Sequence, residues 1–211
     1  MKHRLFTLVE LLTVIAVIAI LAGIAVPVVV GMQSKGRETS ARADMNAIKM
    51  ALTQFKADYS IFPVTGASGD TLYHAGFSAK ADDQNIDTVI SHLTLIAPKP
   101  GTDNAPQDYT STLNKKKRKY LDAPAKPVEA IFKVGDDNPK VGFMKLDPWG
   151  RRYNIALDTN YDKKISLDTT FLGTGSTAET IVGDIAIYSY GTAEDDGDLD
   201  AFLYSWKTNA K

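Results

Sequence analysis

The densest group of reactive side chains lies near the C-terminus. The stretch from Glu194 to Asp200 holds five carboxylates in seven residues, with one glycine among them. Hard oxygen ligands on a flexible loop suit Ca²⁺, which accepts about six to eight of them, backbone carbonyls included. The candidate ligands are Ser189, Asp195, Asp196, Asp198 and Asp200. The pattern favours a calcium site over the alternative, a solvated acidic loop whose charges repel each other.

A second acidic stretch, Asp158 to Asp162, begins like an EF-hand loop. It then has Lys163 where such a loop requires glycine, and Thr169 where the closing glutamate belongs. These two departures exclude an EF-hand. The sequence favours a polar turn between strands over a second ion site.

A further carboxylate, Glu10, precedes a long apolar run. The run from Leu11 to Val30 is twenty residues without a charge. At about 1.5 Å of rise per helical residue, it matches the roughly 30 Å hydrocarbon core of a bilayer. A carboxylate in a membrane helix is costly and calls for a partner, unless it extends to the interface. The sequence therefore predicts a membrane helix. It leaves open whether Glu10 pairs with a cation inside the membrane or extends to the interface.

The orientation of this segment follows from the basic residues before it. Lys2, His3 and Arg4 keep the N-terminus in the cytoplasm by the positive-inside rule, so the rest of the chain is exported. The alternative is a cleavable signal peptide cut near Gly23–Ala25. Such signals have an apolar region of only about 7 to 15 residues, so an anchor is favoured.

The helical pattern continues beyond the apolar run. Six apolar residues follow each other at spacings of four, three, four, three and four, which places them on one helix face. They are Ala41, Met45, Ile48, Leu52, Phe55 and Tyr59. We predict one long helix from residue 6 to about residue 59, which ends before Pro63. The alternative is two separate helices divided at Pro27.

The remaining chain predicts a small α+β head. Helical spacing predicts a short helix over Ile86–Ile96, after a polar loop from Val64 to Asn85. Alternation predicts strands at Tyr153–Leu157 and Ile185–Tyr190 of an antiparallel sheet. A further short strand is expected at Ala130–Val134, followed by a turn over 136–139.

Other features narrow the possible functions. The chain has 211 residues, 24 basic and 25 acidic side chains and no cysteine, which excludes disulfides and thiolate chemistry. The basic run Lys115–Lys119 is interpreted as a solvated loop in preference to a phosphate or nucleic-acid site. His92 stands alone and is interpreted as a packing or surface residue. Because no catalytic motif is present and the three histidines are scattered, we expect no enzyme.

The segment Phe6-Thr7-Leu8-Val9-Glu10, between a basic leader and an apolar helix, resembles the processing motif of type IV pilins and type II secretion pseudopilins. The resemblance implies cleavage by a prepilin peptidase between Leu5 and Phe6, and methylation of the new N-terminus. It also implies that Glu10 pairs with the N-terminal amine of a neighbouring subunit. Leu5 departs from the family, which usually has glycine there.

Two C-terminal features extend this resemblance. Asp147-Pro148-Trp149-Gly150-Arg151-Arg152-Tyr153 is similar to the DPWG-x-x-Y element of the major pseudopilins, in which a tight turn leads into the sheet. The stretch from Ser189 resembles their C-terminal Ser-x-Gly followed by a calcium-binding acidic loop. The resemblance covers Phe6 to Pro63 and Asp147 to the C-terminus.

The resemblance implies a pilin-like architecture with four segments. These are a leader (1–5), a transmembrane and filament-core helix (6–30), its amphipathic continuation (31–60) and a periplasmic head (61–211). The implied function is a structural subunit of a pseudopilus or type IV pilus-like filament in the bacterial inner membrane. Its implied partners are copies of itself, minor pseudopilins and the assembly platform. The alternative is a minor tip subunit or a membrane-tethered module that binds a partner through residues 64–146.

Overall fold

The computed structural model describes residues 8–64, 69–73, 84–98, 106–122 and 146–207. The fold is α+β, with a long N-terminal helix and a small antiparallel sheet, as predicted. The chain divides into two compact units, Met1–Thr39 and Ser40–Lys211. The predicted strand at Ala130–Val134, the turn at 136–139 and parts of the predicted loop after Val64 lie outside the described residues.

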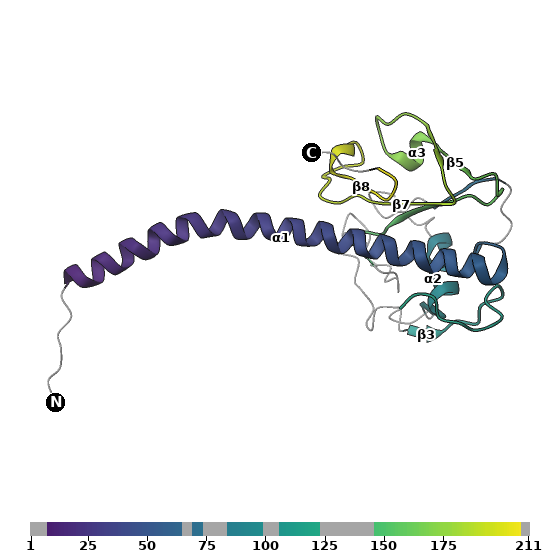
Figure 1. Cartoon of the computed structure of the whole chain (residues 1–211), viewed down its shortest axis with the longest axis horizontal. Coiled ribbons are helices and arrows are strands. Elements are labelled where there is room, and N and C mark those ends of the chain that lie inside the picture. The colour runs from purple at the N-terminus through teal and green to yellow at the C-terminus, as the bar shows by residue number, and fades with distance from the viewer. Residues whose placement is uncertain (1–7, 65–68, 74–83, 99–105, 123–145, 208–211) are drawn as a thin grey trace, which may run out of the picture. The chain divides into compact units, whose positions relative to one another are not determined.

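A single helix, α1 (Leu8–Tyr59), forms the N-terminal part of the chain (Figure 1). Its backbone stays helical through residue 27, so the alternative of two helices divided at Pro27 is wrong. The helix ends where Ser60 adopts a φ of 58° and its amide donates to the carbonyl oxygen of Lys56 at 2.8 Å. The predicted end of the helix is therefore confirmed.

The larger sheet has four antiparallel strands in the order β1-β4-β7-β8. Its strands are β1 (Thr71–Tyr73), β4 (Asn154–Leu157), β7 (Ile185–Ser189) and β8 (Leu203–Tyr204). At its centre Ile155 of β4 lies opposite Ile187 of β7. The two strands predicted from alternation are thus the central pair. The edge strands β1 and β8 were not predicted.

The remaining elements are short. They are α2 (Gln84–Thr94), β2 (Ile96–Pro98), β3 (Pro106–Asp108), β5 (Lys164–Leu167), α3 (Thr169–Leu172), β6 (Glu179–Val182) and the 3₁₀ turn η1 (Leu199–Ala201). Helix α2 confirms the helix predicted at Ile86–Ile96, two residues earlier in the chain. Strands β2 and β3 pair with each other, as do β5 and β6.

Both faces of the central strands are buried. Side chains of a strand alternate between faces, and Ile155 and Ile187 enter a core formed with the second part of α1 and with α2. The intervening residues Ala156 and Tyr188 belong to a second cluster on the other face. This cluster is aromatic, and Tyr188 stacks on Phe202 with ring centroids 5.5 Å apart. The sheet is therefore the middle layer of the head.

The seam predicted on α1 faces the first of these cores. Its apolar members up to Phe55 are at most 2% exposed, and Tyr59 packs at the border of the core. Helical spacing therefore identified the buried face of α1 correctly.

The C-terminal end of α1 is tied to the loop that carries the basic run. Asp58 Oδ2 accepts from Arg118 at 2.8 Å and from the hydroxyl of Tyr120 at 2.6 Å. Hydrogen bonds from Tyr120 and Arg118 lower the pKa of Asp58. The hydroxyl of Tyr59 donates to Asn114 at 2.9 Å. The run is exposed, as predicted, but two of its side chains also hold the loop on the helix, Lys116 and Arg118.

Candidate functional site

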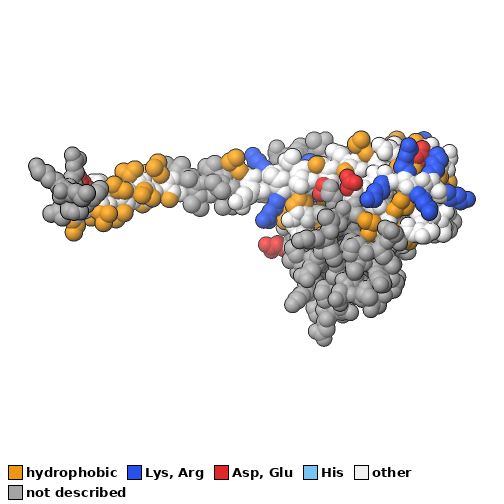
Figure 2. All heavy atoms as spheres, turned by 90° about the horizontal axis from the view of Figure 1, so that it is seen from below, with side chains coloured by type: hydrophobic (Ala, Val, Ile, Leu, Met, Phe, Trp, Pro, Cys, Tyr) orange, Lys and Arg blue, Asp and Glu red, His pale blue; other side chains and the backbone are white. Residues whose placement is uncertain are grey.

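The first unit presents an apolar surface around the helix. Large apolar side chains between Leu8 and Leu21 are at least half exposed, from 52% for Val14 to 78% for Leu8. They point in all directions around α1, and Figure 2 shows hydrophobic side chains along this part of the helix. A helix that is apolar all round is normally buried, in a large assembly or in a membrane. This surface therefore requires cover by lipid or by protein.

Glu10 lies at the start of this surface. It occupies the first turn of α1 and is exposed, and the hydroxyl of Thr13 donates to its backbone carbonyl at 3.0 Å. The positive end of the helix dipole favours an acidic side chain at this position. The predicted processing residues Leu5 and Phe6 lie outside the described residues.

Within the described part of the chain, no helix carries an apolar stretch long enough to cross a bilayer.

The turn at Asp147–Tyr153 is the polar centre of the head. One oxygen of Asp147 accepts from the amides of Trp149 at 3.0 Å and Arg151 at 2.8 Å. The other accepts from the hydroxyl of Ser189, at the end of β7, at 2.6 Å. Gly150 has a φ of 83°, which glycine adopts without strain. The turn thus fixes the entry to β4 against the exit from β7.

The same turn reaches α1 and the C-terminal loop. Tyr153 is fully buried, and its hydroxyl donates to Asp44 of α1 at 3.3 Å. The guanidinium of Arg151 donates to the carbonyl of Ala193 at 2.7 Å. One short motif therefore joins the helix, two strands and the start of the acidic loop.

Asp147 is 4% exposed. Burial raises the pKa of its carboxyl above the usual 3.8, and the hydrogen bonds from Ser189, Arg151 and Trp149 oppose that rise. The folded state therefore holds this proton more tightly than the unfolded chain does. The associated stability is present below pH 3.8 and is lost as the pH rises through the folded pKa.

The predicted calcium ligands fall into two groups. Ser189 is fully buried, where its oxygen donates to Asp147 and accepts from the amide of Gly191 at 3.0 Å. In the loop, Asp195 accepts from the amide of Gly197 at 2.9 Å, and Asp196 accepts from the hydroxyl of Thr174 at 2.7 Å. The structure thus separates Ser189 from the carboxylates of the loop.

The other two predicted ligands, Asp198 and Asp200, lie at the start of η1, where Asp198 makes no capping bond through its side chain. In the described ranges, no group of three or more acidic or histidine side chains forms a metal site.

The two other polar sites considered from sequence are structural. In the stretch after β4, Asp158 accepts from the amides of Asp162 at 3.2 Å and Lys163 at 2.9 Å, which makes a polar turn that leads into β5. The imidazole of His92 is buried and lies 2.5 Å from the hydroxyl of Ser111. Burial lowers the pKa of His92 and favours its neutral form. Both interpretations from sequence are therefore confirmed.

Sequence reasoning missed the polar contacts of α1. No contact was predicted for the charged residues beside the seam, whereas Asp44 accepts a hydrogen bond from Tyr153 and Lys56 pairs with Asp184 at 2.9 Å. These two residues directly adjoin the seam residues Met45 and Phe55 in sequence. Their position next to buried residues was the sequence signal that could have predicted these contacts.

The chain is similar to several curated core proteins of type II secretion systems. The chain is 35% identical over 74 residues to the type II secretion system core protein G of Escherichia coli K12. It is 37% identical over 71 residues to the core protein G of Vibrio cholerae, and 37% over 60 residues to that of Pseudomonas aeruginosa. These matches cover 35%, 34% and 28% of this chain and 51%, 49% and 42% of the relatives.

The resemblance to the type II secretion pseudopilins is confirmed. The chain spans about half the length of the curated pseudopilins that it matches. These relatives are named as core proteins of a secretion system and not as enzymes. This agrees with the expectation from sequence that the chain is not an enzyme. No family model and no solved structure matches the chain.

The Asp147 centre yields a stability prediction. Asp147→Ala should lower the free energy of unfolding by about 2–4 kcal/mol, because it leaves buried donors of Trp149, Arg151 and Ser189 without an acceptor. Asp147→Asn keeps one acceptor oxygen and should cost about half as much. It should also remove the pH dependence assigned to this carboxyl. Thermal unfolding of the full chain, followed by tryptophan fluorescence, measures both effects.

The exposed Asp122→Ala variant is the control and should stay within about 0.5 kcal/mol of the parent chain. Equal melting temperatures for Asp147→Ala and Asp122→Ala would show that Asp147 does not hold the head together.

Proposed function

We propose that the chain is a structural subunit of a pseudopilus, the filament of a type II secretion system. The observation that carries this proposal is the exposed apolar surface of α1 from Leu8 to Leu21, on a helix that continues into the packed head. Similarity to several core G proteins supports the same role. Such a surface is stable only when lipid or other subunits cover it.

In this proposal the apolar part of α1 spans the inner membrane before assembly, with the head in the periplasm. The assembly platform then transfers the subunit to the filament, where helices of neighbouring copies replace lipid around α1. The apolar side chains are buried both in the membrane and in the filament, so transfer between the two exposes little apolar surface to water. The head stays outside the bundle on the packed part of the same helix.

Glu10 sets the register of the helices in the proposed filament. Processing before Phe6 creates a new amine, which remains a cation after methylation. In an apolar bundle an unpaired carboxylate is costly, so the contact of Glu10 with the amine of a neighbouring copy selects one position along the helix.

The register proposal is tested in cells that express the assembly machinery. Glu10→Ala should abolish sheared filaments in electron micrographs, whereas Glu38→Ala, on the same helix beyond the apolar surface, should leave them. Immunoblots should find both variants in the membrane at parental levels. Normal filaments from Glu10→Ala would contradict the register role, and a few copies at each tip would indicate a minor subunit.

Processing is tested by the mass of the membrane-extracted protein. We expect a mature chain that begins at a methylated Phe6. Replacement of Leu5 by glycine, the usual family residue, should preserve or increase the processed fraction, and Phe6→Asp should reduce it. A mature chain that begins at Met1 or near Val26 would contradict the proposal.

We also propose that the C-terminal loop binds Ca²⁺. The donor chemistry fits a hard cation, because Asp195, Asp196, Asp198 and Asp200 offer carboxylate oxygens within six residues. The loop is tied to Thr174, whose amide donates to the carbonyl of Asp196 at 3.0 Å and whose hydroxyl donates to its carboxylate at 2.7 Å. Calcium would neutralise the repulsion among these carboxylates and order the loop. Ser189 has its bonds within the head and is the weakest of the candidates.

Calcium binding is measured by calorimetry and thermal unfolding of the full chain in detergent. Millimolar calcium should raise the melting temperature, because a ligand of the folded state stabilises it by mass action. Asp198→Asn should reduce the shift, whereas Asp162→Asn, in the turn after β4, should leave it unchanged. An unchanged melting temperature at millimolar calcium would contradict the site.

A further inference from the structure

The basic run Lys115–Lys119 forms a loop that the fold holds in one position, although its residues are exposed. The loop folds around Asn114, which is buried. The side-chain amide of Asn114 donates to the carbonyl of Arg118 at 2.7 Å, and its oxygen accepts from the amide of Arg118 at 3.1 Å. The amide of Lys116 donates to the hydroxyl of Tyr59, at the end of α1, at 2.8 Å. The second unit therefore presents these charges on a fixed backbone.

Most of the positive charge of this basic loop has no partner in the head. Lys116 and Arg118 share one carboxylate, that of Asp58, at 3.7 Å and 2.8 Å. The other three basic side chains make no ion pair or hydrogen bond with any residue that the structure describes. They are Lys115, Lys117 and Lys119. Figure 2 shows basic side chains gathered at the end of the head that contains the end of α1. The basic loop thus keeps an excess of positive charge.

The opposite charge is concentrated in the acidic loop Glu194–Asp200. It carries five carboxylates in seven residues, and four of the five residues are exposed, all but Asp196. Among the described residues, no basic side chain forms an ion pair with these carboxylates. The head therefore has two exposed surfaces of opposite charge.

The sheet separates these two loops within one copy. Leu113 and Tyr120 flank the basic loop and pack against the first core, together with α1 and α2. Ala193 and Leu199, at the two ends of the acidic loop, pack in the second cluster, on the other face of the sheet. In Figure 1, β3, which precedes the basic loop, and β8, which follows the acidic loop, lie on opposite sides of α1.

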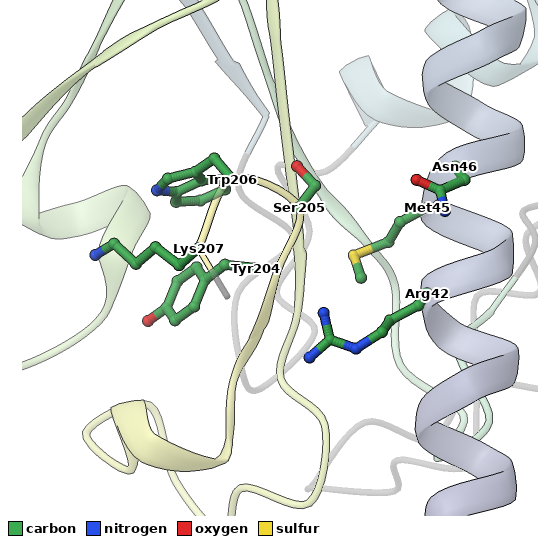
Figure 3. Close-up of a pocket in the computed structure, with 7 residues that line it drawn as sticks. All are labelled: Arg42, Met45, Asn46, Tyr204, Ser205, Trp206 and Lys207. Carbon is green, nitrogen blue, oxygen red and sulfur yellow. The ribbon is translucent and has the colours of Figure 1, made fainter. Parts of the chain in front are cut away.

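The two loops are also attached at different positions along α1. The end of β8 faces Arg42, Met45 and Asn46 across a pocket of about 270 Å³ (Figure 3). The basic loop is instead attached at Asp58, twelve residues beyond Asn46. At about 1.5 Å per helical residue this is about 18 Å along α1. The basic loop of one copy can therefore meet an acidic loop only on another copy.

We propose that the basic loop Lys115–Lys119 docks on the acidic loop Glu194–Asp200 of a second copy of the chain. The two surfaces are complementary, with five basic against five acidic side chains. Because they are different surfaces, the contact is heterologous, and a heterologous contact that does not close a ring continues into an open helical assembly. Its role in a filament rests on the proposed pseudopilus.

The contact orients neighbouring heads and adds little affinity of its own. Ion pairs between exposed side chains stabilise weakly, whereas complementary charged surfaces speed association and select the orientation. The apolar surface of α1 supplies the main attraction between copies in the proposed filament. One Ca²⁺ in the acidic loop would leave three of its five negative charges, so the contact is compatible with the proposed calcium site.

Cross-linking of introduced cysteines tests the contact without a filament. The chain has no cysteine, so each introduced thiol reports one position. Full-length Lys117→Cys and Asp198→Cys chains are reconstituted together in vesicles of phosphatidylcholine and phosphatidylglycerol and treated with a short bis-maleimide. We expect a dimer from the mixture and little from either variant alone. Salt at about 1 M should reduce the yield, because it shortens the Debye length to about 3 Å.

The control replaces Lys117→Cys by Lys49→Cys, another exposed lysine, on α1. A yield equal to that of this control overturns the contact. Benzoylphenylalanine in place of Lys119 distinguishes a second copy from lipid in the same vesicles. Photolabelling of a second chain supports the contact, whereas labelling of lipid alone assigns the basic loop to anionic headgroups and overturns it.

An exchange of charges tests the role of the contact in filaments. One variant carries Lys115→Glu, Lys117→Glu and Lys119→Glu, and the other carries Glu194→Lys, Asp198→Lys and Asp200→Lys. Each should lose most of the sheared filaments at parental levels of membrane protein, because like charges then meet. The chain with all six changes should recover them, which a merely structural role of either loop does not predict.

Normal filaments from both reversed variants overturn the role of the contact in the filament. Absence of filaments from the parent chain overturns the filament proposal alone, because cross-linking in vesicles still decides the contact.

Discussion

The burial of one face of α1 between Ala41 and Phe55 is the contact on which the head depends. Ala41, Ile48, Leu52 and Phe55 are completely buried, and complete burial of a large apolar side chain contributes about 1.5–3 kcal/mol. The central strands contribute their apolar side chains to the same core. Without these side chains of α1 the core on this face of the sheet would be incomplete. The helix is therefore a structural part of the head and not a linker to it.

The sequence predicts this seam because the helical period is visible in the chain itself. The strands β4 and β7 can also be predicted from the sequence, because apolar residues alternate in both over at least four positions. Within the described residues, β1 has three residues and β8 has two, too few for any periodicity to stand out. Their existence depends on pairing with segments distant in the sequence, such as Thr71 with Leu157. Such partners cannot be deduced from local pattern.

The candidate sites show the same difference between what a local sequence pattern predicts and what only the fold determines. The motif at Asp147 is recognisable as a tight turn, because Pro148 and Gly150 favour one. That its carboxylate binds Ser189, 42 residues later, follows only from the fold. Ser189 was grouped with the acidic loop because the stretch that begins there resembles a Ser-x-Gly followed by a calcium-binding loop, yet β7 carries it into the core. The sequence therefore predicts the acidic loop, but it does not predict which groups each side-chain oxygen contacts.

The brevity of β8 has a consequence for the proposed filament, in which many copies would lie close together. The open edge of a sheet is a template for another strand, and crowding of identical chains makes that reaction faster. A two-residue edge beside α1 offers too few successive hydrogen bonds for long, in-register pairing. In the proposed filament this edge could therefore lie close to other copies without forming a long intermolecular sheet.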